Sequence, residues 1–387
     1  MAFSSHALLP ARAGAVQPRR ATTRQVRNSA PTGACTRMVR VAPPPMATSS
    51  PLATSSDSPS ATAAGVRQQK RRANEREGNV DGPYWVDETC INCDTCRWMA
   101  PHTFSKVGNG SAVVEQPRSE QERVVALQAL LSCPTHSIHA DERSREDLQA
   151  AQQGLPALVP GVPNVYHCGW HSEKSFGAAS YLLVRPVSEG GNIMFDSPRY
   201  NGVLAKNIEA LGGVSTIILS HKDDVADHAK WASHFNAKRI LHELEVQAST
   251  ADVEVKLQGD GPWDLDGRPL QMRRIGGAAQ PPPGSQIVHT PGHSTGSICV
   301  WYEPQKAMFT GDHLSQDERE PSELRVFTRY VKDSLPRQLE NIQKLLQYDW
   351  MHVLPGHGRR FHARDAAHRL EATSKVVSRR GLPANMV

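Results

Sequence analysis

The amino-acid sequence predicts an α/β protein in which a two-sheet αββα sandwich follows a small α+β domain. After about residue 165, apolar strand-like runs alternate with segments of helical periodicity, and before it four cysteines punctuate short strands and one helix. The first fifty-odd residues are rich in Ser, Thr, Ala, Pro and Arg, and no acid precedes Asp57, so no folded domain is expected there. The expected division is a disordered segment 1–66, a charged linker 67–80, a small domain 81–145, a connector 146–164 and a sandwich 165–387.

Length and charge limit the classes of function. The chain has 387 residues, of which 39% are hydrophobic, which suits a globular protein of two or three domains. The formal net charge is +5, but residues 1–56 carry seven Arg and no acid, and subtracting these seven charges leaves −2 for the rest. A nucleic-acid partner needs a basic patch in the folded part, so we expect none. No run of about 18 apolar residues occurs, so we expect no membrane span.

The N-terminal composition is typical of an organelle transit peptide. Richness in Ser and Thr without a clear Arg-rich amphipathic helix favours the plastid stroma, with the mitochondrion as the alternative. An ordinary disordered tail explains the same composition and stays open.

Four cysteines form one pattern, Cys90-x-x-Cys93-x-x-Cys96 followed by Cys133-Pro134. A stroma or matrix is reducing, and three cysteines at this spacing cannot all pair locally, so we do not expect disulfides. Thiolates at this spacing can hold one iron–sulfur cube. Zinc held by the same four thiolates is the alternative, although a zinc ribbon uses two Cys-x-x-Cys pairs. An amphipathic helix over 119–131 is expected to deliver Cys133.

The cysteine pattern and its surroundings resemble a bacterial-type ferredoxin over about Tyr84 to Ile138. The likeness rests on the cysteine triple, the following Ala100-Pro101 and the later Cys133-Pro134. In two-cluster ferredoxins the fourth cysteine of each run serves the other cluster, so one triple with one lone cysteine implies a single 4Fe-4S cluster.

A second chemical stretch follows the apolar run Thr216–Leu219. From His221 to His228 the chain carries two imidazoles and three carboxylates within eight residues, which is a density typical of metal binding. The alternative is a charged first helical turn, with acids where the helix dipole favours them.

Three more strand-then-turn segments end on a possible ligand. They are Pro291-Gly292-His293, Gly311-Asp312 and Gly356-His357. A glycine in each lets the backbone turn tightly, so that side chains from distant strands can reach a common point.

This order of motifs resembles the metallo-β-lactamase superfamily, whose pattern is a strand-end Asp, an HxHxDH loop, a PGH loop, a GD loop and a late GH. The resemblance runs from about Val165 to about Leu370 and implies a sandwich with its ligands at one edge of both sheets. It implies that Asp196 holds the metal loop, and that His293, Asp312 and His357 bind metal.

The chain departs from the family at the HxHxDH loop. His221 fits the first position, Asp223 replaces the second His, and Asp227-His228 arrive two residues late. If a bulge absorbs the two residues, Asp227 and His228 still serve, with Asp227 as a catalytic residue; otherwise Asp224 or a water takes the place. The expected metal ligands are therefore His221, Asp223, Asp227, His228, His293, Asp312 and His357.

One or two divalent ions, zinc or iron, are the expected cofactors beside the 4Fe-4S cluster. Carboxylates favour iron or manganese over zinc, and the flavodiiron branch of the superfamily has HxExD at this place and binds iron. Metal identity stays open at this point.

Three functions are compatible with the sequence. The first is a metal-dependent hydrolase of a small molecule, a thioester or an ester. The second is a redox enzyme in which the cluster exchanges electrons with iron at the His/Asp site, with a plastid electron donor as partner. The third is a non-catalytic redox sensor or binding protein. The loops GxxxxGK[ST] and GxGxxG are absent, which disfavours nucleotide-triphosphatase and Rossmann functions.

Overall fold

The computed structural model describes residues 72, 74–275 and 278–379. The predicted transit segment 1–66 and residues 67–71 and 73 of the charged linker lie outside the described residues. By their contacts, residues 67–387 group into one unit. None of the helices that the structure describes has the length and apolar character needed to cross a membrane.

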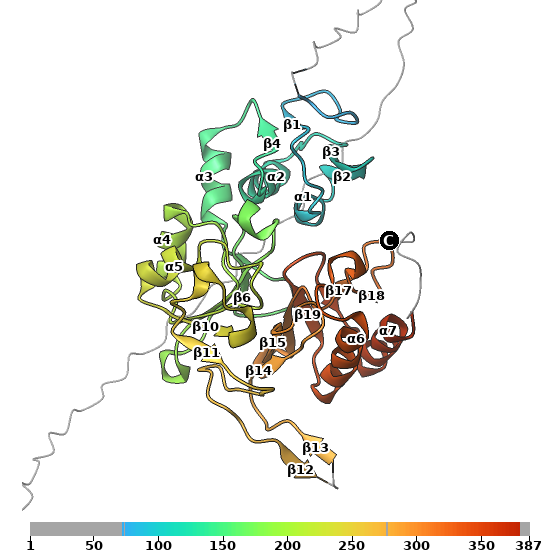
Figure 1. Ribbon diagram of the computed structural model, residues 1–387. Coiled ribbons are helices and arrows are strands. Elements are labelled where there is room, and N and C mark those ends of the chain that lie inside the picture. Colours follow the sequence, from blue (N-terminus) through green and yellow to red (C-terminus); the bar gives the residue numbers. More distant parts are fainter. Residues whose placement is uncertain (1–71, 73, 276–277, 380–387) are drawn as a thin grey trace, which may run out of the picture. The chain divides into compact units, whose positions relative to one another are not determined.

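The small domain contains two antiparallel strand pairs and two helices (Figure 1). The first strand pairs with the last, so both ends of the domain meet in one ladder. The elements are β1 (Tyr84–Val86) with β4 (Ile138–Ala140), the hairpin of β2 (Phe104–Val107) and β3 (Gly110–Val113), and the helices α1 (Thr95–Met99) and α2 (Glu120–Ser132).

Helix α2 confirms the helix expected over 119–131. Ser119 caps it by accepting a hydrogen bond from the backbone N–H of Glu122, whose side chain accepts from the Ser119 N–H in return. This capping box satisfies two donors that the helix leaves free. Leu127 is fully buried on its inner face, and the helix ends directly before Cys133.

The predicted connector 146–164 is more structured than expected. It contains helix α3 (Arg145–Gln153), capped by Ser144, and strand β5 (Ala157–Leu158). Asp147 of α3 accepts a 2.7 Å hydrogen bond from Arg123 of α2. Helix α3 is mostly polar and buries only a narrow face, which is why composition alone suggested a linker.

The first sheet of the sandwich has seven strands, in the order β11-β10-β9-β8-β7-β6-β5. Strands β5 to β8 are antiparallel neighbours, whereas β8, β9, β10 and β11 are parallel. Their bounds are β6 (Val165–His167), β7 (Tyr181–Leu183), β8 (Ile193–Phe195), β9 (Thr216–Ile218), β10 (Lys238–His242) and β11 (Val255–Leu257).

The second sheet has five strands, in the order β14-β15-β16-β19-β20, and its β16 and β19 are parallel. The strands are β14 (Gln286–His289), β15 (Ile298–Tyr302), β16 (Ala307–Gly311), β19 (His352–Pro355) and β20 (Phe361–His362). Two short pairs lie outside the sheets: β12 (Arg273–Ile275) with β13 (Ala278–Gln280), and β17 (Ser315–Gln316) with β18 (Leu324–Arg325).

Alternate side chains of the strands enter different apolar layers, because successive residues of a strand point to opposite faces. Ile218 of β9 and Phe309 of β16 share the layer between the sheets. Their neighbours Ile217 and Met308 belong to the two outer layers. The first outer layer includes α4 (Gly202–Ala210) and α5 (His228–Phe235), and the second includes α6 (Leu335–Lys344) and α7 (Ala366–Ser378). The predicted αββα sandwich is confirmed (Figure 1).

Candidate metal centre

Four loops at one edge of the two sheets bring the candidate ligands together. His221 follows β9, and His293 lies in the turn between β14 and β15. Asp312 directly follows β16, and His357 comes two residues after β19, the parallel neighbour of β16. Parallel neighbours end at the same edge, so Asp312 and His357 meet although 45 residues separate them.

Asp312 lies between two groups of side chains. Its Oδ2 is 3.9 Å from Nε2 of His221 and 3.7 Å from Nε2 of His293. Its Oδ1 is 2.6 Å from Nδ1 of His357. One carboxylate that faces ligands on both sides has the placement of a bridge between two ions.

The first group is His221, Asp223 and His293, whose ligand atoms lie within 4.8 Å of one another. Nε2 of His221 is 3.6 Å from Oδ2 of Asp223, and the rings of His221 and His293 are nearly perpendicular, with centroids 4.8 Å apart. Two imidazoles and one carboxylate therefore converge on one point.

The second group is formed around Asp224. Its ligand atom lies within 4.8 Å of those of His221 and Asp312, and its Oδ2 is 3.8 Å from Nδ1 of His357. Asp224 is fully buried.

Buried polar atoms without partners show that these residues fit metal ions. Among the described residues, Nε2 of His221, both ring nitrogens of His293 and both oxygens of Asp224 are buried and form no hydrogen bond. An unsatisfied buried polar group costs about 1–3 kcal/mol, and several in one place point to an additional ligand. Imidazole nitrogens and carboxylate oxygens are the donors that zinc and iron accept.

Burial and charge set the protonation of the four central groups. Burial lowers the pKa of His221 to about 4, and burial raises the pKa of Asp224 well above its usual value, with Asp312 adding to the rise. Burial opposes the charged forms of Asp312 and His357, but their mutual attraction wins: the pKa of Asp312 falls below its usual value, and that of His357 rises to about 10.

The metal loop is held in place by groups around it. Asp196, directly after β8, accepts a 2.7 Å hydrogen bond from the Ser220 N–H, which is the role expected of it. The hydroxyl of Ser220 lies 2.9 Å from Nδ1 of His221 and fixes the ring, leaving Nε2 toward the centre.

Asp227 and His228 lie outside this centre, so the expectation that both bind metal and that Asp227 is catalytic is corrected. Asp227 accepts hydrogen bonds from Lys174 Nζ at 2.8 Å and from the Tyr200 N–H at 3.0 Å. His228 is the first residue of α5, and its Nε2 is 3.2 Å from the Ser249 carbonyl. The backbone turns at Ala226, with φ of 32°, so the two additional residues lead into α5 and Asp224 takes the inner place.

Two residues beside the candidate metal centre, Glu245 and Lys332, belong to none of the sequence motifs described above. Glu245 accepts hydrogen bonds from the backbone N–H groups of Lys222 at 3.1 Å and Gly296 at 2.7 Å, and so ties the first metal loop to the turn of His293. Lys332 forms an ion pair with Asp223, and its backbone N–H donates to the His293 carbonyl at 2.7 Å. Neither contact is local in sequence, so spacing could not have found them.

Residues 292–296 read Gly-His-Ser-Thr-Gly, the spacing of a serine-hydrolase nucleophile turn. Ser294 is buried, and its hydroxyl lies 2.6 Å from that of Ser297. Strand β15 follows this turn rather than a helix, so the turn is not a nucleophile elbow.

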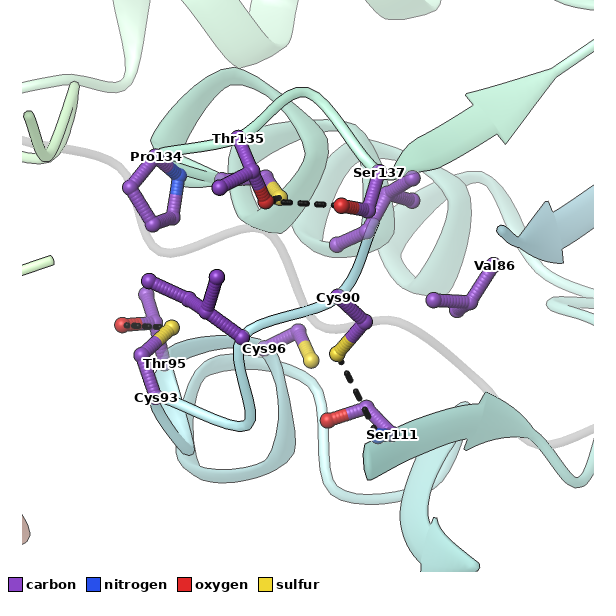
Figure 2. A pocket seen from close by; sticks show the side chains of 12 residues that line it. Val86, Cys90, Cys93, Thr95, Cys96, Ser111, Pro134, Thr135 and Ser137 are labelled. Carbon is purple, nitrogen blue, oxygen red and sulfur yellow. Dashed lines mark hydrogen bonds between the residues drawn. The ribbon is translucent and has the colours of Figure 1, made fainter. Parts of the chain in front are cut away.

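The four patterned cysteines line one small cavity in the small domain (Figure 2). The Ser111 N–H donates to Sγ of Cys90 at 3.5 Å, and Sγ of Cys93 is 3.4 Å from Oγ1 of Thr95. Burial raises the pKa of the Cys93 and Cys96 thiols. Thiolates gathered at such a place need a cationic partner, and the donor set fits a 4Fe-4S cluster.

Cys168 is fully buried, and a histidine lies close to it on each side in the sequence, His167 and His171. His167 and His171 are also buried, with their Nε2 atoms 2.7 Å apart. Nδ1 of His171 is 3.1 Å from Oγ1 of Thr95 in the small domain, so this segment lies at the seam between the small domain and the sandwich.

Two family models match the chain, one over the small domain and one over the sandwich. Residues 86–140 match the family model "4Fe-4S single cluster domain of Ferredoxin I", and residues 175–360 match "Metallo-beta-lactamase superfamily". A search of curated proteins gives no match.

Solved structures similar to the chain include two metallo-β-lactamases and a flavo di-iron protein. BLEG-1 B3 metallo-β-lactamase is 17% identical, covers 52% of this chain and 94% of its own, and has a TM-score of 0.38. DIM-1 metallo-β-lactamase is 15% identical, covers 55% and 94%, and has a TM-score of 0.39. A mutant flavo di-iron protein from Thermotoga maritima is 18% identical, covers 52% and 52%, and has a TM-score of 0.34.

Proposed function

We propose that this chain, which carries a single-cluster 4Fe-4S ferredoxin domain and a metallo-β-lactamase domain, is a metal-dependent hydrolase of a small ester or thioester. The observation that carries the proposal is the position of Asp312. It lies between two groups of ligands, with unpartnered buried atoms on His221, His293 and Asp224 around it.

Two divalent ions would divide these residues between them. His221, Asp223 and His293 would hold one, Asp224 and His357 the other, and Asp312 would be shared. Divalent metal bound there would supply a hydroxide near neutral pH and would polarise a substrate carbonyl.

The chain's own residues orient this chemistry. Nδ1 of His357 faces Asp312 and Asp224, and its Nε2 lies 3.4 Å from the Phe176 carbonyl, which fixes the ring. Outer partners of this kind hold ligands in one orientation and raise their basicity. Asp196 does the same for the His221 loop through Ser220.

Charge and exposure at the centre favour a substrate with an anionic group. Lys332 is half-exposed and pairs with Asp223, so its ammonium lies at the open side of the first group. Phe176 is 64% exposed, while its carbonyl contacts His357, so its ring offers apolar surface beside the centre. A carboxylated small molecule with an apolar portion fits both features.

Metal-reconstituted protein tests the hydrolase proposal with a panel of esters and thioesters that carry a carboxylate. Asp312→Ala and His293→Ala should lose turnover by at least about a hundredfold, because each removes a ligand. Asp227→Asn is the matched control, since this acid belongs to the same loop but faces Lys174, and it should retain turnover. Equal activity in Asp312→Ala and in the original protein would reject the proposal.

A redox enzyme is the second candidate, because one observation favours it. The group of His221, His293 and Asp223 has the two-histidine, one-carboxylate composition typical of non-haem iron. Anaerobic protein with about six irons, falling to about four in Asp312→Ala, would favour this candidate over the hydrolase.

The composition of residues 1–66 supports a further proposal, targeting to the plastid stroma, where an electron donor for the cluster would be available. A fluorescent fusion of this segment should enter plastids; uptake by mitochondria would reject the plastid.

A further inference from the structure

The segment from His171 to Ala179 lies against both the cluster loop and the His357 loop. A Cβ added to Gly177, whose φ is +86°, would stand 3.1 Å from Cβ of Cys93, so the backbone itself packs on the cluster loop. On the other side, the Ala179 N–H donates to the Gly356 carbonyl at 2.7 Å. One short segment therefore contacts both candidate cofactor sites.

Hydrogen bonds run from a cluster sulfur to this segment. Sγ of Cys93 is 3.4 Å from Oγ1 of Thr95 (Figure 2), and that oxygen is 3.1 Å from Nδ1 of His171. The same Nδ1 is 2.8 Å from the Gly177 carbonyl. Thr95 and His171 are both buried, so water does not compete for these contacts.

The direction of each hydrogen bond follows from its partners. The Gly177 carbonyl can only accept, so Nδ1 of His171 carries hydrogen, and Nε2 accepts from Nε2 of His167 at 2.7 Å. Burial lowers the pKa of both imidazoles, so both are neutral, as this assignment requires. A cluster-bound Cys93 sulfur has no hydrogen, so the Thr95 hydroxyl donates to it.

The chain of contacts continues to the metal centre through one peptide unit. Gly177 follows Phe176, whose carbonyl lies 3.4 Å from Nε2 of His357. A carbonyl can only accept, so Nε2 of His357 donates to it, while Nδ1 faces Asp312. The same His357 thus has metal-centre carboxylates at one ring nitrogen and the bridging segment at the other.

A second contact joins the same two loops independently. Arg359, two residues after His357, donates to both oxygens of Asp94, at 2.7 Å and 3.1 Å. Asp94 lies between Cys93 and Cys96, is buried, and also accepts from Arg97 at 2.6 Å. Movement of the His357 loop would therefore move the loop that carries two cluster ligands.

We propose that Thr95 and His171 are positioning residues that link the two centres, so that metal bound at His357 changes the reduction potential of the cluster. Hydrogen bonds to cluster sulfurs set that potential, and the Thr95 hydroxyl donates one of them. Linkage is reciprocal, so reduction of the cluster changes metal affinity by the same factor. The proposal goes beyond hydrolysis and does not depend on which reaction the centre performs.

Anaerobic redox titration of the full holo-protein tests this linkage. Dithionite supplies one electron to the cluster, no covalent bond forms or breaks, and the reduced cluster is followed by its electron paramagnetic resonance signal. Zinc is the probe for the metal centre because it takes up no electron. We expect bound zinc to raise the potential, since added positive charge favours reduction; a tenfold difference in zinc affinity between the two states equals about 59 mV.

Three substitutions test whether the effect of zinc on the cluster potential depends on the contacts through Thr95, or only on the short distance between the two centres. Thr95→Val should lower the cluster potential and lose most of the zinc-dependent shift, and Thr95→Ser should restore both. Thr135→Val is the matched control: Oγ1 of Thr135 is 3.8 Å from Sγ of Cys133 and 2.7 Å from the Ser137 hydroxyl, within the small domain. It should keep the shift.

Arg359→Gln keeps every cluster ligand and Thr95. It therefore provides a second measurement of the zinc-dependent shift if Thr95→Val loses its cluster. We expect a reduced zinc-dependent shift in this variant. The proposal is overturned if the original protein takes up no zinc, if zinc binds without moving the potential, or if Thr95→Val or Arg359→Gln keeps the whole shift.

Discussion

Oδ1 of Asp312 lies 2.6 Å from Nδ1 of His357, while Oδ2 of the same carboxylate faces His221 and His293 at 3.9 Å and 3.7 Å. One acid therefore belongs to both ligand groups, whereas Asp223 belongs to one. The number of metal ions bound by variants of these two acids can therefore show whether Asp312 is shared between two ions.

Asp312→Ala should leave the sandwich with less than one bound ion per chain, whereas Asp223→Ala should retain about one. The reason is that Asp312 faces both groups and Asp223 only the first. Metal analysis of anaerobically purified protein, corrected for the cluster iron, measures the difference. Equal metal content in the two variants would contradict a shared carboxylate.

Glu245→Ala should weaken metal binding without removing a ligand. Its carboxylate accepts from Lys222 at 3.1 Å and Gly296 at 2.7 Å, joining two metal loops, and its loss should cost about 2–3 kcal/mol of folding free energy. Outer-shell changes reduce metal affinity by about 10–100-fold. Urea unfolding and a competing chelator measure both effects, with the exposed Glu243→Ala as the control.

Gly292→Ala should unfold the turn that carries His293. The φ of Gly292 is +140°, and an added Cβ would stand 2.3 Å from Cα of Gln338 at the start of α6. Thermal unfolding should show a large loss of stability and metal analysis a loss of binding. Gly202→Ala is the control, because nothing lies within 4 Å of its Cβ position, and no large loss of stability is expected.

Acid should selectively remove the contribution of Glu254. Hydrogen bonds from Arg239 lower the pKa of Glu254 to about 2, so its stabilisation is complete above the usual value of 4.5 and disappears as the pH falls toward 2. Its side chain is 46% exposed, so solvent screening limits the effect to about 1 kcal/mol. Glu254→Gln should be less stable than the original protein at pH 7, and the difference should shrink below pH 4.5 and vanish only at about pH 2 and below, by urea unfolding.

Cys133→Ser should abolish the visible absorption of the cluster, because Cys133 lines the cavity with the other three cysteines. Cys168→Ser is the matched control, since Cys168 is buried but lies outside that cavity. Loss of the absorption in both variants would argue against the assigned ligand set.

The sequence predicted the parts of the centre that local chemistry determines. His293, Asp312 and His357 each follow a strand end on a glycine-containing turn, so their meeting follows from the order of the strands. The sequence alone does not predict whether Asp224 or Asp227 faces the candidate metal centre, because this depends on the backbone turn at Ala226.

Contacts between segments that lie far apart in the chain could not be predicted from the sequence either. His167 and His171 are buried where the small domain lies against the sandwich and Thr95 contacts His171. The sequence predicts a connector where α3 lies, because this helix buries only Asp147 and Ala151 and the Arg123–Asp147 pair joins residues that are far apart in the chain. Lys332 and Glu245 act through backbone contacts that leave no spacing pattern.

Because β16 pairs with β19, this part of the second sheet can form only after both strands have left the ribosome. Met308 pairs with Val353, so the ladder beside Asp312 stays incomplete until a strand more than forty residues later has emerged. The candidate metal centre therefore cannot form before β19 has been made, and a nascent chain stopped before β19 would present an open sheet edge to other chains.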